Sequence, residues 1–302
     1  MDYKTLIDAE TWAFIHRTGE FYPPDATDMS ITDQRRVYDE MSAAFRQPKP
    51  EGVSCRDRDF SGVPCRLYQV NGADTTVVFF HGGGFVVGGL DSHDDVCAEI
   101  CVRTGFRVLA VDYRLSPEHE HPAAFNDAIA ATRHAAETWP GTLLLCGDSA
   151  GGNLAAATAH ALRGEIDFAG QVLIYPGLGG DHDAGSYLDH ADAPMLTRDE
   201  VLYYMAIRAN GPDDPTAAPL RDTDFTDLPR TVTVAAECDP LADDARVYAA
   251  RIAAAGGQAH CIGELGLTHG YLRGRTTVTR ARDSFGRIVS ALSALGAGTW
   301  PF

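Results

Sequence analysis

The pentapeptide Gly147-Asp148-Ser149-Ala150-Gly151 places a serine between two glycines at the end of an apolar run. That run, Thr142–Cys146, is typical of a buried strand, and the Ala-rich stretch Asn153–Leu162 that follows is typical of a helix. A strand that turns sharply into a helix around a serine forms a nucleophile elbow, and only residues without bulk fit on either side of it. The sequence therefore predicts that Ser149 is a nucleophile for acyl transfer, at the positive N-terminal end of a helix.

A second glycine-rich run, His81-Gly82-Gly83-Gly84, follows the predicted strand Thr75–Phe80. The chain between this run and Ser149 has room for one helix and one further strand. Acyl transfer needs preorganised N–H donors for the oxyanion, and consecutive glycines let bare backbone approach a substrate closely. We interpret the run as an oxyanion loop; the alternative is a tight glycine turn with no part in chemistry.

A serine hydroxyl needs a general base, and the base needs an acid that orients it. After a nucleophile elbow the acid comes next along the chain and the histidine last. Asp239 stands just beyond the apolar run Thr231–Ala236, and His269 follows the apolar segment Ala259–Leu267 and precedes a glycine. We therefore predict Ser149 as nucleophile, His269 as general base and then general acid, and Asp239 as the orienting acid.

Other acids compete for this role. Glu237 lies two residues before Asp239 at the end of the same predicted strand, so it remains the alternative acid. Asp243 and Asp244 fall in the next predicted helix, where we interpret them as solvated or N-terminal helix charges.

Cysteines and histidines raise the question of a metal site. Cys97 and Cys101 are four residues apart, but no second pair follows at a zinc spacing, which favours packing. Cys146 and Cys238 are interpreted as small buried hydrophobes. The seven cysteines are scattered and odd in number, which does not describe a disulfide framework. The remaining candidate ligands are typical of solvated loops, so we predict no metal site: His119, His121, Asp181-His182-Asp183 and Asp189-His190-Ala191-Asp192.

The elements that must position these residues alternate between strand and helix. Such alternation predicts an α/β fold with a mostly parallel sheet covered by helices on both faces, and sites on such sheets gather at the carboxyl ends of the strands. Gly83, Ser149, Asp239 and His269 all follow predicted strands and so meet at one edge. The predicted elements are Thr75–Phe80, Asp95–Arg103, Arg107–Asp112, Pro122–Thr138, Thr142–Cys146, Asn153–Leu162, Gln171–Tyr175, Thr231–Ala236, Leu241–Ala255, Ala259–Ile262 and Thr277–Leu295.

Two blocks interrupt this alternation. Residues 1–48 are rich in aromatic and polar side chains and contain an amphipathic stretch, Ile31–Phe45. Residues 177–220 lie between two strand-like runs and contain a helical stretch, Thr197–Ala209, that opens with a capping-box pattern. The core is then expected in two parts, 49–176 and 221–302.

The chain has 302 residues, 45% of them apolar, and a formal net charge of −17. An acidic surface of this kind repels nucleic acid and anionic membranes, which favours neutral or cationic small molecules as substrates. The N-terminus shows no signal-peptide pattern, and no apolar stretch approaches membrane-spanning length. We expect a cytoplasmic protein with neither nucleic-acid nor membrane partners.

The chain resembles the hormone-sensitive-lipase-like esterases, the bacterial branch of the α/β-hydrolases. The matching pieces occur in the family's order: His81-Gly82-Gly83-Gly84-Phe85, Asp112-Tyr113-Arg114-Leu115-Ser116-Pro117-Glu118, Gly147-Asp148-Ser149-Ala150-Gly151-Gly152, Asp239-Pro240-Leu241 and His269-Gly270. Two local departures, Ser116 in place of alanine and Tyr271 in place of phenylalanine, could alter the acyl pocket.

The resemblance implies hydrolysis of carboxylic esters, mainly with short acyl chains, without a cofactor. It implies a helical cap built from residues 1–48 and 177–220, and an oxyanion hole made of the N–H groups of Gly83, Gly84 and Ala150. His81 would brace the oxyanion loop without doing chemistry, and Asp148 is a supporting residue. A homodimer through the edge strand near Ala259–Ile262 is expected from the family alone.

Three other functions remain open on the same residues. An amidase or arylformamidase would use the same triad on a poorer leaving group. A deacetylase for acetyl esters would differ only in the pocket. A non-catalytic small-molecule receptor would be expected to lose a triad member, whereas here all three positions are filled.

Overall fold

In the computed structural model, which describes residues 1–23, 26–209, 211 and 213–302, an eight-stranded sheet forms the centre of the protein. Strands β1 and β2 pair antiparallel, as do β2 and β4, and all the other neighbours are parallel. This confirms the predicted mostly parallel sheet. In the spatial order β1-β2-β4-β3-β5-β6-β7-β8 the strands are β1 (Ser54–Phe60), β2 (Val63–Gln69), β4 (Arg107–Val111), β3 (Thr76–Phe80), β5 (Leu143–Asp148), β6 (Phe168–Ile174), β7 (Thr231–Cys238) and β8 (Ala259–Thr268).

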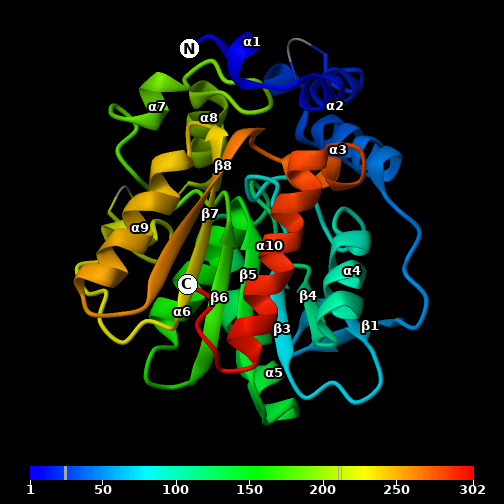
Figure 1. Ribbon diagram of the computed structural model, residues 1–302, viewed down its shortest axis with the longest axis vertical. Coiled ribbons are helices and arrows are strands. Elements are labelled where there is room, and N and C mark those ends of the chain that lie inside the picture. The colour runs from blue at the N-terminus through cyan, green and yellow to red at the C-terminus, as the bar shows by residue number, and fades with distance from the viewer. Residues whose placement is uncertain (24–25, 210, 212) are drawn as a thin grey trace.

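Helices cover both faces of the sheet (Figure 1). Helices α4 (Asp94–Thr104) and α10 (Thr279–Gly296) pack on one face, while α5 (Ala123–Thr138), α6 (Ala150–Ala161) and α9 (Ala242–Ala254) pack on the other. Strand β3 shows why both faces need a cover. Its side chains alternate, with Val77 and Phe79 in one apolar core and Val78 and Phe80 in the second, and all four are fully buried.

The two blocks outside the alternating pattern lie together at one end of the sheet (Figure 1). The first contains α1 (Tyr3–Leu6), α2 (Ala9–Gly19), η1 (Ala26–Asp28) and α3 (Ile31–Phe45). The second contains α7 (Ser186–Asp189), α8 (Arg198–Arg208) and, at its end, η2 (Pro219–Arg221). Helix α8 begins with the predicted capping box between Thr197 and Glu200. Residues 24, 25, 210 and 212 of these blocks lie outside the described residues.

The antiparallel hairpin β1–β2 is absent from the sequence prediction. Strand β1 is polar and largely exposed, so it shows no apolar periodicity. The hairpin turns at Ser61 and Gly62, which both adopt positive φ values, of 58° and 84°. Two positive values in a row describe a type I′ turn, which matches the twist of the strands on either side. The Ser-Gly pair was the available sequence signal.

Strand β8 is also longer than predicted. The prediction ended at Ile262, but the strand continues to Thr268 beside β7. Gly263, Glu264 and Gly266 interrupt its apolar pattern. The extension carries the chain up to His269, and η3 (Tyr271–Thr276) follows directly.

Candidate active site

Ser149 stands at a sharp turn between β5 and α6, with φ 54° and ψ −117°. Its N–H donates to the carbonyl of Ile174 at 2.9 Å, which ties the turn to the neighbouring strand β6. The glycines on either side are sterically required, since a Cβ on Gly151 would collide with the carbonyl of Phe80 and a Cβ on Gly147 with the backbone of Gly151. Strained geometry of this kind persists only where the surroundings impose it.

The three side chains predicted to act together do meet at the carboxyl ends of their strands. The Nε2 atom of His269 lies 2.9 Å from Ser149 Oγ, and its Nδ1 atom lies 2.7 Å from Asp239 Oδ2. Asp239 is completely buried, and its other carboxylate oxygen accepts the N–H of Leu241 at 2.9 Å. The ring of Tyr175 packs edge-on against His269, with centroids 4.8 Å apart. This arrangement can move a proton from a hydroxyl to an oriented imidazole.

The alternative acid, Glu237, lies elsewhere. Its Oε2 atom accepts the N–H of Gly266 at 2.7 Å, so it holds the end of β8. Asp244 differs from its predicted role as a solvated or helix-end charge. It does lie in the first turn of α9, but it is only 1% exposed. It accepts the N–H of Leu178 at 2.5 Å and the hydroxyl of Tyr187 at 3.1 Å, and so holds the start of the 177–220 insertion.

The predicted oxyanion loop and Ser149 line one cavity, which is described below. The carbonyl of Gly83 accepts the N–H groups of Val86 and Val87, both at 3.0 Å, which folds the loop into a tight turn. Within the described ranges, no protein acceptor takes the N–H groups of Gly83, Gly84 and Ala150. Three such donors beside a serine hydroxyl are available to an oxygen that gains negative charge.

A buried network supports this loop. Asp148 accepts the N–H of Gly82 at 2.8 Å and lies 3.1 Å from His93 Nε2. Burial alone would raise the pKa of Asp148, but His93, the Arg273 guanidinium and the Gly82 N–H together lower it to about 2. The carboxylate therefore stays ionised and fixes the first glycine of the loop.

His81 supports the loop from the other side. Its ring stacks on Tyr113, with centroids 4.3 Å apart, and the Tyr113 hydroxyl donates to the His81 carbonyl at 2.6 Å. Burial lowers the pKa of His81 to about 4, so the ring is neutral at pH 7. His93 and Tyr113 were missed as supporting residues. In the sequence, Tyr113 could have been noticed as part of the Asp112-Tyr113-Arg114 motif, whereas no motif contains His93.

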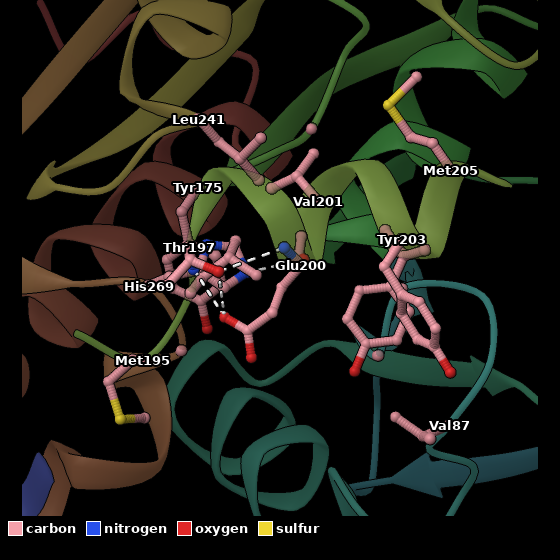
Figure 2. A pocket seen from close by; sticks show the side chains of 18 of the residues that line it. Val87, Tyr175, Met195, Thr197, Glu200, Val201, Tyr203, Met205, Leu241 and His269 are labelled. Carbon is pink, nitrogen blue, oxygen red and sulfur yellow. Dashed lines mark hydrogen bonds between the residues drawn. The ribbon is translucent and has the colours of Figure 1, made fainter. Parts of the chain in front are cut away.

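A cavity of about 730 Å³ opens beside Ser149 and His269. Figure 2 shows His269 among the side chains that line it. Its walls come from α2, α3, the oxyanion loop and helix α8 of the insertion. Asn153, on α6, donates to the carbonyls of Gly177 and Ala217 at 2.7 and 2.8 Å and thereby ties together the two ends of the insertion. Figure 2 labels several apolar and aromatic side chains that line the cavity, among them Val87, Met195, Val201, Tyr203, Met205 and Leu241.

The residues considered as metal ligands are dispersed. Cys97, Cys101, Cys146 and Cys238 are fully buried, as expected of packing residues, and burial raises the pKa of the Cys238 thiol to about 12. His121 pairs with Asp214 and Thr216 at 3.1 and 2.9 Å. No group of three His, Cys, Asp or Glu side chains in the described part of the chain could hold a metal ion. None of its helices is both long enough and apolar enough to cross a membrane.

Comparison with known proteins places this geometry in a family. Residues 77–273 match the model of a family with the α/β-hydrolase fold. A carboxylesterase of Mycobacterium tuberculosis, NlhH, is 37% identical over 76% of this chain and 77% of its own length. The ethyl acetate hydrolase of Pseudomonas putida is 30% identical over 96% of both chains. The chain belongs to the hormone-sensitive-lipase-like esterases of the α/β-hydrolase superfamily.

Solved structures agree with this membership. A bacterial heroin esterase superposes on this esterase with a TM-score of 0.87 at 28% identity, covering 98% of this chain and 99% of its own. The hyperthermophilic esterase of Pyrobaculum calidifontis superposes with a TM-score of 0.82 at 30% identity, covering 89% of this chain and 94% of its own. The chain is accordingly a carboxylic ester hydrolase.

Proposed function

We propose that this esterase hydrolyses short-chain acyl esters through an acyl-enzyme intermediate, with Ser149 as nucleophile, His269 as base and Asp239 as orienting acid. The observation that carries the proposal is the continuous chain of hydrogen bonds from Asp239 through His269 to Ser149, at 2.7 and 2.9 Å. The N–H groups of Gly83, Gly84 and Ala150, which no acceptor among the described residues takes, support it.

In the proposed reaction, Ser149 Oγ attacks the ester carbonyl while His269 Nε2 takes its proton. The N–H groups of the oxyanion loop and of Ala150 stabilise the negative oxygen of the tetrahedral intermediate. His269 then protonates the departing alcohol, which leaves the acyl group on the serine. Water, deprotonated by the same imidazole, attacks the acyl carbonyl, the bond to Ser149 Oγ breaks, and His269 returns the proton to that oxygen as the acid leaves. Asp239 keeps the Nδ1 side of the ring protonated and facing the carboxylate throughout.

We further propose that residues 1–48 and 177–220 form a cap over this site. Both blocks supply cavity walls, among them Tyr22 and Met41 from the first and Met195 and Tyr204 from the second. A cap assembled from two separate segments restricts the cavity on the side opposite Ser149. Deletion of residues 1–30 is expected to change the acyl-chain preference or abolish activity; an unaltered chain-length profile would contradict the cap.

The test is hydrolysis of p-nitrophenyl esters from acetate to palmitate by the wild type and by Ser149→Ala, with exposed Ser290→Ala as the matched control. We expect turnover that is fastest on short chains, lost in Ser149→Ala and retained in the control. Full activity of a folded Ser149→Ala would overturn the assignment. A matched p-nitroanilide measures amidase activity, which is expected to be slower because an amine leaves less readily than a phenolate.

A further inference from the structure

Arg273 contributes a positive charge to the wall of the cavity that contains Ser149. It lies in η3, four residues after His269, and lines the cavity wall. Its Nε and Nη2 atoms are buried and have no hydrogen-bond partner among the described residues. Burying the donors of a guanidinium without acceptors is costly, so each such group calls for an explanation.

Two other arginines nearby have hydrogen-bond acceptors for their buried guanidinium groups. Arg275, two residues further along η3, pairs with Asp95 at 2.7 Å and Glu99 at 2.9 Å. Arg208, which lines the same cavity, donates to the Ala217 carbonyl at 2.8 Å. Arg273 differs from both because two of its donor atoms, Nε and Nη2, have no acceptor in the described part of the chain.

The groups around Arg273 keep its guanidinium charged. Its guanidinium carbon lies 4.7 Å from the centroid of the Tyr38 ring, a cation–π contact that gives Nε and Nη2 no acceptor. Burial alone would lower the pKa of Arg273, but Tyr38 and the Asp148 carboxylate raise it above the ordinary value. Asp148 itself is engaged by Gly82 and His93.

We propose that Arg273 binds a carboxylate carried by the substrate, so that the preferred esters are half-esters of dicarboxylic acids or esters of carboxylate-bearing alcohols. This inference rests on the proposed esterase function. The planar guanidinium fork matches a carboxylate with two parallel hydrogen bonds. A singly charged group is favoured over a phosphate because Asp199 and Glu200 line the same cavity and would repel a second negative charge.

Two substrate pairs test this proposal, one for each side of the ester. Monoethyl glutarate is compared with its carboxamide, ethyl 4-carbamoylbutanoate, and 4-acetoxybenzoate with 4-acetoxybenzamide. The wild type should prefer the carboxylate of at least one pair in kcat/KM. Arg273→Met should reduce that preference about tenfold or more, and Arg273→Lys should retain part of it, since the charge remains while the fork is lost. Arg282→Met removes the same charge from an exposed site on α10 and should keep the preference.

Equal rates within both pairs in the wild type, or an undiminished preference in Arg273→Met, would overturn the proposal. If Arg273→Met does not fold, two other measurements test the proposal. One is the carboxylate preference of Arg273→Lys, and the other compares competitive inhibition of the wild type by glutarate and benzoate with inhibition by their amides. Calorimetric titration of Ser149→Ala with glutarate and benzoate separates this question from catalysis. Loss of turnover without carboxylate binding would contradict only the carboxylate site, whereas binding with retained turnover would contradict only the role of Ser149.

Discussion

The ring of Tyr204, on helix α8, lies directly against Gly84 of the oxyanion loop. A Cβ added to Gly84 would come within 2.6 Å of the Tyr204 Cγ atom, and the glycine also adopts a φ of 60°. The insertion therefore contacts the proposed oxyanion loop, and we expect the position of α8 to be coupled to the shape of this loop.

Gly84→Ala is expected to lower kcat on p-nitrophenyl acetate by about a hundredfold, because it displaces a proposed oxyanion donor. The matched control is Gly72→Ala. That glycine also has a positive φ, of 79°, but a Cβ there meets nothing within 4 Å. The control bears the same backbone strain far from the site and should lose some stability with kcat unchanged. Wild-type kcat in Gly84→Ala would contradict the role given to this loop.

A double variant separates strain from contact. Gly84→Ala combined with Tyr204→Ala relieves the collision with the ring but not the unfavourable φ. We expect the double variant to recover part of the kcat lost by Gly84→Ala, which a double-mutant cycle measures as a coupling term. Strict additivity of the two effects on kcat would show that α8 and the loop are independent.

Asp239→Asn is expected to reduce kcat by about 10⁴, since an amide favours the wrong tautomer of His269. Glu237→Gln is the matched control, because Glu237 is two residues away on the same strand end and bonds Gly266 instead. The control should retain kcat and lose at most some stability. Equal losses of kcat in the two variants would reopen the choice of acid.

Much of the fold was accessible from the sequence because the central strands are buried on both faces. Runs such as Thr76–Phe80 and Leu143–Asp148 leave no alternative to a covered strand. Strand β1 shows the limit, since polar residues at a sheet edge form a strand only because β2 pairs with them. That pairing is a tertiary effect with no local hydrophobic pattern.

In the site, the order of serine, acid and histidine along the chain was enough to select the residues that meet at Ser149. The reason is that the carboxyl ends of parallel strands lie at one edge of the sheet. The supporting residues could not be found in this way. His93 reaches Asp148 across the fold from the start of α4, and Asp244 is buried only because the insertion closes over it. The spacing of residues along the sequence does not predict how deeply the end of a helix is buried, nor where an insertion lies on the fold.

Asp244 should make stability depend on pH. Burial raises its pKa from 3.8 to about 6, so the folded state holds a proton that the unfolded state releases. The contribution of Asp244 to the free energy of unfolding is therefore fully present below about pH 4. It is lost as the pH rises to about 6 and beyond, by up to about 3 kcal/mol. Asp244→Asn, which keeps an acceptor for Leu178, should lack this decline. Denaturant unfolding at pH 4, 5, 6 and 7 measures the difference, and parallel curves for the two proteins would contradict the prediction.

The net charge of −17 and the cation at Arg273 act on an anionic ester over different distances. The Debye length, the distance over which charges still interact, is about 30 Å at 0.01 M salt but only about 8 Å at 0.15 M. Added salt therefore removes the long-range repulsion before it weakens a buried contact. We expect kcat/KM for the preferred carboxylate ester to rise several-fold over this range, while its carboxamide partner stays nearly constant. Arg273→Met should keep this salt slope at a lower absolute rate, because the slope comes from the whole surface. A fall in kcat/KM with salt would show that attraction, rather than the acidic surface, governs how the anion reaches the cavity.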